Sequence, residues 1–279
     1  MTAPKAEIRR EIYGASPGRE LLSLLKRGSW RPIVRIGGIA VWTSGLFVFL
    51  IAGMWATTPW QARRRWWRNL IVKRWARGLA WIVNMRMRIE GPRPAAPFFL
   101  VANHLSYVDI VLMLAQVDTV FVAKRELGQW PILGYLTRLV GTIFLDRESR
   151  RDAVRAIGAI DRRIDDGDGV VVFPEGTSSD GADVYPMKTA LFEWAAQKGY
   201  PVRHAAIHYR TGPGAPPARE AVCWWGSMSF MPHVIELCEL RGFEATVRFG
   251  DEPLVGNDRG ELAIRARDAI AANFVAHTP

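Results

Sequence analysis

The chain has 279 residues, of which 49% are hydrophobic and 23% charged, so it can bury a core and is not intrinsically disordered. Its formal net charge of +10 would suit a nucleic-acid-binding protein, but the charge is unevenly placed. Residues 1–90 hold 17 Lys and Arg against 4 Asp and Glu, whereas the other 189 residues hold 20 against 23. This near-neutral remainder argues against a nucleic-acid partner.

Residues 1–84 are predicted to anchor the chain to a membrane. No charged side chain occurs from Ile36 to Ala62, and a helix over about residues 36–57 is long enough to cross a hydrocarbon core of roughly 30 Å. Eight of the twelve tryptophans lie in or beside this stretch, as expected of the aromatic belt of a membrane segment. The basic flanks should bind an anionic membrane surface.

A second N-terminal helix, rich in arginine and tryptophan, is predicted over about residues 63–84. Its basic residues do not segregate to one face, and we expect it to lie at the membrane interface rather than to cross. Whether residues 36–57 span or re-enter the membrane is left open. The heavier basic flank follows the apolar stretch, which predicts a cytoplasmic location for the rest of the chain.

Two other interpretations of the apolar stretch are less favoured. A cleavable signal peptide would begin nearer the N-terminus and end in a small-residue cleavage site, and neither condition is met. A helix buried in a soluble protein is hard to reconcile with the adjacent cluster of arginine and tryptophan over residues 63–68.

From about residue 85 to residue 279, short β-branched or aromatic runs alternate with helical stretches. This alternation predicts an α/β domain with a central, largely parallel mixed sheet flanked by helices. The predicted strands are Phe98–Ala102, Thr119–Ala123, Thr142–Leu145, Gly169–Phe173, Val202–Ile207, Ala221–Trp225 and Ala245–Phe249. The predicted helices are Val108–Ala115, Ile132–Leu139, Ser149–Asp165, Met187–Gln197 and Arg259–Phe274.

A histidine and an aspartate follow the first predicted strand of this domain. His104 comes just after the strand end, where ligand sites gather in α/β sheets, and Asp109 follows five residues later. If His104 lies on the turn and Asp109 in the first helical turn, the carboxylate can orient the imidazole and stabilise its protonated form. On these residues alone, a structural histidine beside an N-terminal helix acid is equally possible.

Polar residues also follow three other predicted strands. Glu175, Gly176 and Thr177 lie where backbone N–H groups could face a ligand. Lys124 and Arg147 each follow a strand and would bring cations to one rim of the sheet, suited to a phosphate or a carboxylate. Four polar strand ends together favour a binding site over isolated surface charges.

Three motifs in this region resemble those of a known family. The segment from Asn103-His104 to Asp109 resembles the NHxxxxD block of the glycerolipid acyltransferases, the 1-acylglycerol-3-phosphate acyltransferase family. Residues 141–147 and 173–178 are similar to the second and third blocks, in the same order and spacing. A fourth block is matched only weakly at Pro201-Val202, because Arg203-His204 interrupts the usual proline and aliphatic run. The likeness spans roughly residues 85–210.

The resemblance implies a membrane-bound acyltransferase. It would transfer a fatty acyl group from acyl-CoA or acyl carrier protein to the free hydroxyl of 1-acylglycerol-3-phosphate, giving phosphatidic acid. His104 would be the general base, oriented by Asp109, with no covalent acyl-enzyme. Because the acceptor is a membrane lipid, the active site would lie at the cytoplasmic face of a bacterial-type inner membrane.

The same resemblance assigns substrate binding. Arg147 and Lys124 would bind the phosphate of the acceptor, and Glu175, Gly176 and Thr177 would shape its site. No cofactor and no metal is expected, since the four other histidines have no ligand-like spacing. The two cysteines match neither a metal site nor a disulfide framework.

Three alternatives remain open. The acceptor could be another lyso-lipid, such as a lyso-ornithine lipid, because Arg147 and Lys124 would pair with a carboxylate as readily as with a phosphate. A hydrolase using the same residues would release free fatty acid without an acceptor. A non-catalytic membrane tether would keep the anchor but would not need the pair of His104 and Asp109.

Overall fold

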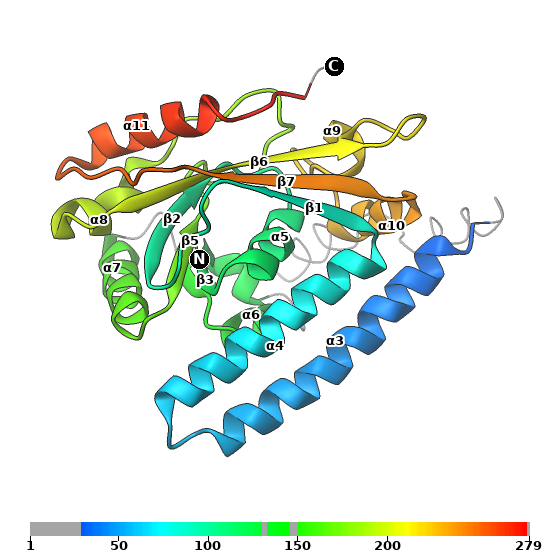
Figure 1. Cartoon of the computed structure of the whole chain (residues 1–279), viewed down its shortest axis with the longest axis horizontal. Coiled ribbons are helices and arrows are strands. Elements are labelled where there is room, and N and C mark those ends of the chain that lie inside the picture. The colour runs from blue at the N-terminus through cyan, green and yellow to red at the C-terminus, as the bar shows by residue number, and fades with distance from the viewer. Residues whose placement is uncertain (1–28, 130–132, 146–149, 278–279) are drawn as a thin grey trace. The chain divides into compact units, whose positions relative to one another are not determined.

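The computed structural model describes residues 29–129, 133–145 and 150–277. It has the predicted α/β class, with a seven-stranded mixed sheet flanked by helices (Figure 1). The chain forms two compact units. The first consists of residues up to 87 together with 106–115 and 209–245, and the second of residues 88–105, 116–208 and those from 246 onward.

The sheet is built around a parallel centre. Its strands are β1 (Met85–Glu90), β2 (Phe98–Ala102), β3 (Thr119–Lys124), β4 (Ile143–Leu145), β5 (Gly169–Val172), β6 (Val202–Thr211) and β7 (Phe243–Phe249). They are ordered β1-β7-β6-β2-β5-β3-β4, and β2 pairs in parallel with both β5 and β6. Every residue of β2 and β5 is buried, which explains why both are continuous apolar runs in the sequence.

The helices fall between these strands as the alternating pattern predicts. They are α3 (Arg31–Ala56), α4 (Gln61–Ile82), α5 (Val108–Gln116), α6 (Leu133–Leu139), α7 (Arg150–Asp165), α8 (Glu193–Lys198), α9 (Ala218–Ala221), α10 (Phe230–Glu239) and α11 (Arg259–Ala271). Two short 3-10 helices, η1 (Arg125–Gln129) and η2 (Thr189–Phe192), complete the set in the described residues. The predicted helix Met187–Gln197 is therefore divided between η2 and α8.

One predicted strand is wrong. Ala221–Trp225 is the end of α9 followed by a loop. The backbone N–H groups of Val222 and Cys223 both donate to the carbonyl of Ala218, so they close a helical turn instead of joining a ladder. Val222 and Cys223 are fully buried, and burial of an irregular segment produces the same apolar run as a strand.

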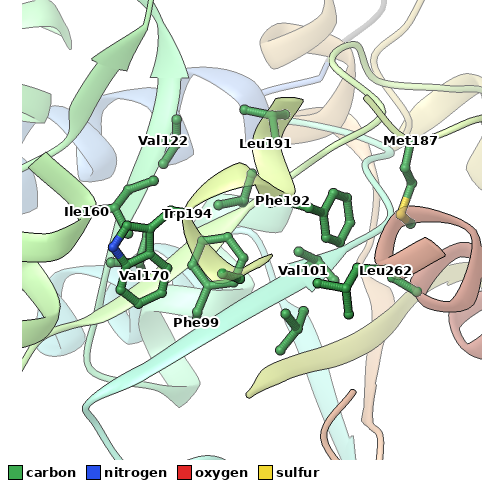
Figure 2. Close-up of a cluster of buried hydrophobic side chains, with 14 of the residues drawn as sticks. Phe99, Val101, Val122, Ile160, Val170, Met187, Leu191, Phe192, Trp194 and Leu262 are labelled. Atoms are coloured by element: carbon green, nitrogen blue, oxygen red, sulfur yellow. The ribbon is translucent and has the colours of Figure 1, made fainter. Parts of the chain in front are cut away.

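The hydrophobic core of the second unit holds β2 and β5 in place. Phe99 and Val101 of β2 and Val170 of β5 pack with Trp194 of α8 and Leu262 of α11 (Figure 2). The ring centroids of Phe99 and Trp194 are 5.5 Å apart. Because both faces of the central strands are covered, the strand ends are the positions left for polar chemistry.

Helices α3 and α4 of the first unit lie side by side as an antiparallel hairpin (Figure 1). Tryptophans join them: the indole N–H of Trp42 donates to the carbonyl of Trp75 at 3.2 Å, and that of Trp67 to the carbonyl of Phe49 at 3.2 Å. Each indole ring packs against a glycine of the other helix. A Cβ at Gly53 would lie 1.9 Å from Trp67 Nε1, and one at Gly78 would lie 2.1 Å from Trp42 Nε1.

This packing predicts that Gly53→Ala destabilises the hairpin. The added methyl would displace the ring of Trp67, and overpacking of this kind costs about 1–3 kcal/mol. Thermal unfolding in detergent should show a lower Tm. Gly45→Ala is the matched control on the same helix, because nothing lies within 4 Å of its Cβ position. Equal unfolding temperatures for the two variants would contradict the proposed fit between glycine and tryptophan.

Helix α3 is long and apolar enough to cross a membrane, and it is the one such helix in the described part of the chain. Only 6% of its most apolar window is buried inside the protein. Its exposed side chains include Val41, Val48, Phe49 and Trp55. An exposed apolar surface of this extent suits a lipid environment, and α3 is thus a candidate membrane anchor.

Candidate active site

The turn after β2 is held by Asn103, whose side chain is buried. Its Nδ2 donates to the carbonyl of Ile207 at 3.0 Å, and its Oδ1 accepts from the backbone N–H of Ile207 at 2.7 Å. The amide thus makes with β6 the two hydrogen bonds that a backbone unit would make. This anchor places His104 at the second position beyond the strand, directly after Asn103.

His104 is half-buried and rests on an aromatic ring. Its imidazole stacks on Phe173 with ring centroids 4.3 Å apart and planes 13° apart, and Phe173 in turn stacks on Phe121. The backbone is fixed as well, since the carbonyl of His104 accepts from Ser179 at 2.9 Å. A flat ring against one face of the imidazole defines the plane in which the ring nitrogens act.

Glu175 contributes to the same turn. Its carboxylate is buried, and Oε1 accepts from the backbone N–H of His104 at 3.0 Å. Sequence reasoning assigned Glu175 to the acceptor site, whereas the structure places it against the main chain of His104. The next two residues differ in burial. Gly176 is buried and has a positive φ of 82°, whereas Thr177 is exposed.

The two cations that the sequence predicts to bind an anion are Lys124 and Arg147. Lys124 is an exposed residue at the end of β3, in register with Leu145 of β4. Arg147 lies outside the described residues.

Asp109 lies in the first turn of α5, in the first unit, and is completely buried. Its Oδ2 accepts from the backbone N–H of Ser106 at 3.0 Å, and its Oδ1 accepts from the hydroxyl of Tyr209 at 2.5 Å. Each oxygen of the buried carboxylate thus accepts a hydrogen bond, which offsets part of the cost of removing the carboxylate from water. His104 belongs to the second unit, and its pairing with Asp109 stays a prediction.

Tyr107, one of the four residues between His104 and Asp109 in the sequence, contacts His233 within the first unit. Its hydroxyl and Nδ1 of His233 are 3.1 Å apart. Burial lowers the pKa of His233 to about 4, so the ring is neutral at physiological pH. Trp224 and Phe230 pack edge-on against Tyr107. His233 is thus a buried residue of the first unit.

Sequence reasoning missed three contributors to this arrangement. Asn103 was read only as part of a motif, and the role of the Ser106 backbone was not considered. Tyr209 lies 100 residues from Asp109, and no local pattern connects the two. Within the described residues, no group of three or more His, Cys, Asp or Glu side chains is arranged to hold a metal ion.

Comparison with known proteins defines the class. A family model described as Acyltransferase matches residues 85–207. A lyso-ornithine lipid O-acyltransferase of Rhizobium meliloti is 36% identical over 199 residues, covering 67% of each chain. The enzyme of that name from Rhodobacter capsulatus is 31% identical over 264 residues, covering 92% of this chain and 91% of the relative. A 1-acyl-sn-glycerol-3-phosphate acyltransferase of Neisseria meningitidis is 33% identical, covering 58% and 67%.

A solved structure has the same fold. The crystal structure of the 1-acyl-sn-glycerophosphate acyltransferase PlsC from Thermotoga maritima matches with a TM-score of 0.62 at 19% identity, covering 87% of this chain and 95% of that one. The family model and these relatives define the class, a lipid acyltransferase. The chain belongs to the glycerolipid acyltransferase family, and it is an enzyme that acylates lyso-lipids.

Proposed function

We propose that the acyl acceptor of this enzyme is a lyso-ornithine lipid. The observation that carries the proposal is the length of the similarity to enzymes of that name. Those of Rhodobacter capsulatus and Pseudomonas aeruginosa align with 92% and 88% of this chain and over 91% of their own length, so the likeness extends well beyond residues 85–207. Ornithine supplies a carboxylate, which Lys124 and Arg147 can pair with as they would with a phosphate.

A second candidate acceptor is 1-acylglycerol-3-phosphate, with phosphatidic acid as the product. Sequence reasoning placed this acceptor first, on the motif that contains Arg147. The relative from Neisseria meningitidis carries that activity in its name and is 33% identical. Both candidates present a hydroxyl to the acyl thioester, so the chemistry of acyl transfer is the same for both.

In the proposed mechanism, His104 is the general base. Its neutral imidazole takes the proton from the acceptor hydroxyl while the oxygen attacks the thioester carbonyl of acyl-CoA or acyl carrier protein. A C–O bond forms, the C–S bond breaks, and the thiolate leaves with the proton that the imidazolium returns. Asp109 orients the ring and stabilises its charged form. The mechanism uses no cofactor other than the acyl thioester substrate.

The other predicted site residues have supporting roles in this proposal. The carboxylate of Glu175 keeps the His104 turn in place through the backbone N–H that it accepts. Gly176 and Thr177 would line the acceptor site beside that turn, where backbone N–H groups can stabilise the developing oxyanion. Lys124 and Arg147 would pair with the carboxylate of the ornithine headgroup.

We further place the hairpin of α3 and α4 in a single leaflet, with the catalytic residues at the cytoplasmic headgroup plane. Helix α4 carries seven Lys and Arg, and each would cost about 2.5–3.5 kcal/mol at the bilayer centre. Because α3 packs along α4, a crossing by α3 would draw these cations into the hydrocarbon. An interfacial position keeps them at the anionic surface while the exposed face of α3 meets the acyl chains.

The acceptor assignment is tested with the purified enzyme, isotopically labelled acyl-CoA and acyl carrier protein, and vesicles containing one lyso-lipid at a time. Mass spectrometry of the products should show a kcat/KM at least about tenfold higher for the lyso-ornithine lipid than for 1-acylglycerol-3-phosphate. The reverse preference would establish the second candidate. Free fatty acid formed without any acceptor would indicate a hydrolase and overturn both.

A further inference from the structure

Tyr209 in β6 is one of the largest fully buried side chains, and its polar end is directed to a specific partner. The hydroxyl donates to Oδ1 of Asp109 at 2.5 Å. Tyr209 and Asp109 belong to the same compact unit. A short hydrogen bond from a buried hydroxyl to a buried carboxylate is among the stronger neutral-to-charged contacts in proteins.

The two oxygens of Asp109 are held from different directions. Oδ2 accepts from the backbone N–H of Ser106, which belongs to the turn that begins α5, whereas Oδ1 accepts from a strand 100 residues further on. The Ser106 contact is local and would form in an isolated helix start. The Tyr209 contact is therefore the one that ties the carboxylate to the sheet and selects its rotamer.

The environment keeps Tyr209 a donor. Burial and the neighbouring Asp109 carboxylate raise the pKa of its phenol well above 10, so the O–H proton is retained at every working pH. The other titratable groups that face it are the Cys223 thiol and the Tyr107 hydroxyl. Tyr107 contacts His233, whose pKa of about 4 leaves that ring neutral.

We propose that Tyr209 is a positioning residue for acyl transfer, whose hydroxyl holds the Asp109 carboxylate in the rotamer that serves His104. The proposal rests on the roles given above to Asp109 and His104. Tyr209 itself touches neither substrate nor reacting atoms. It acts through Asp109 alone.

Loss of the hydroxyl should change the pH dependence in one direction. Without this donor, the carboxylate binds a proton more readily, because a hydrogen bond to the charged form lowers the pKa. The remaining negative charge would also be less neutralised, which raises the proton affinity of the imidazole. Both effects move the acid limb of the kcat/KM profile to higher pH.

The experiment compares Tyr209→Phe with Tyr107→Phe in the full-length enzyme. Phe at 209 keeps the edge contact with Phe243 and removes only the hydroxyl. We expect its acid limb to rise by about one pH unit and its kcat at pH 7 to fall by about tenfold, with KM little changed. Tyr107→Phe removes a hydroxyl of the same kind whose partner is His233, and its acid limb should coincide with that of the wild type.

An unmoved acid limb in a folded Tyr209→Phe would overturn the proposal, and any loss of rate would then be a packing effect. If the variant does not fold, 3-fluorotyrosine placed at 209 keeps the shape and strengthens the donor, and the limb should move to lower pH. An unmoved acid limb in the 3-fluorotyrosine variant would also contradict the proposal. The proposed role of His104 is tested separately, because turnover retained by His104→Ala would overturn it. If His104→Ala is inactive and the acid limb of the kcat/KM profile of Tyr209→Phe is unmoved, only the role of Tyr209 is overturned.

Discussion

Replacing His104 by alanine should reduce acyl transfer by about three orders of magnitude or more, since the reaction would lose its proposed general base. The measurement is release of the CoA thiol in the presence of vesicles and acceptor. Vesicle binding and Tm should change little, because the ring of His104 is only half-buried.

Two companion variants make this result specific. His277→Ala removes another partly buried histidine of the second unit, one that contacts the backbone of Asp180, and should keep its turnover. Asp109→Asn preserves the shape of the buried side chain and should lower kcat by about a hundredfold, because the amide cannot stabilise an imidazolium. Turnover by His104→Ala above the background of heat-inactivated enzyme would rule out the proposed base.

The second large effect is expected on the exposed face of α3. Val41 and Val48 are 75% and 66% exposed, so the double variant Val41→Glu/Val48→Glu should fold normally. Each buried carboxylate would oppose insertion into lipid by about 2–3 kcal/mol, and the two together should lower membrane affinity by about a hundredfold or more. Co-sedimentation with anionic vesicles measures the affinity directly.

Activity should then depend on how the acceptor is presented. We expect a large loss with an acceptor embedded in vesicles and little loss with a short-chain analogue dissolved in water. Val255→Glu is the matched control, since that valine is 51% exposed on the second unit and lies outside the anchor. Equal losses on both forms of acceptor would mean that the substitutions damage the enzyme rather than its attachment.

The sequence predicted the elements that carry a local signal. The strands β2 and β5 were found because burial on both faces leaves an unbroken apolar run. The motif also predicted that His104 follows a strand and that Asp109 lies in the first turn of the next helix, which is where the structure has them. Strand β1 (Met85–Glu90) was missed, although its residues alternate between apolar and charged, because the pattern is short and follows a long basic helix.

What could not be predicted depends on pairing across the chain. The contact between Asn103 and Ile207 and that between Tyr209 and Asp109 each join residues about 100 positions apart. Nothing in the local composition of β6 distinguishes a tyrosine that fills the core from one that also serves a carboxylate. The same limitation produced the wrong strand at residues 221–225, where tertiary burial imitates a β pattern.

The proposed single-leaflet placement of the hairpin would have a consequence for the lipid supply. An enzyme that enters only one monolayer draws its acceptor from that monolayer and returns the diacylated product to it. With two hydrophobic tails in place, the product is retained there and does not exchange through water. Product molecules needed in the opposite leaflet must be moved across the bilayer by a separate translocation step.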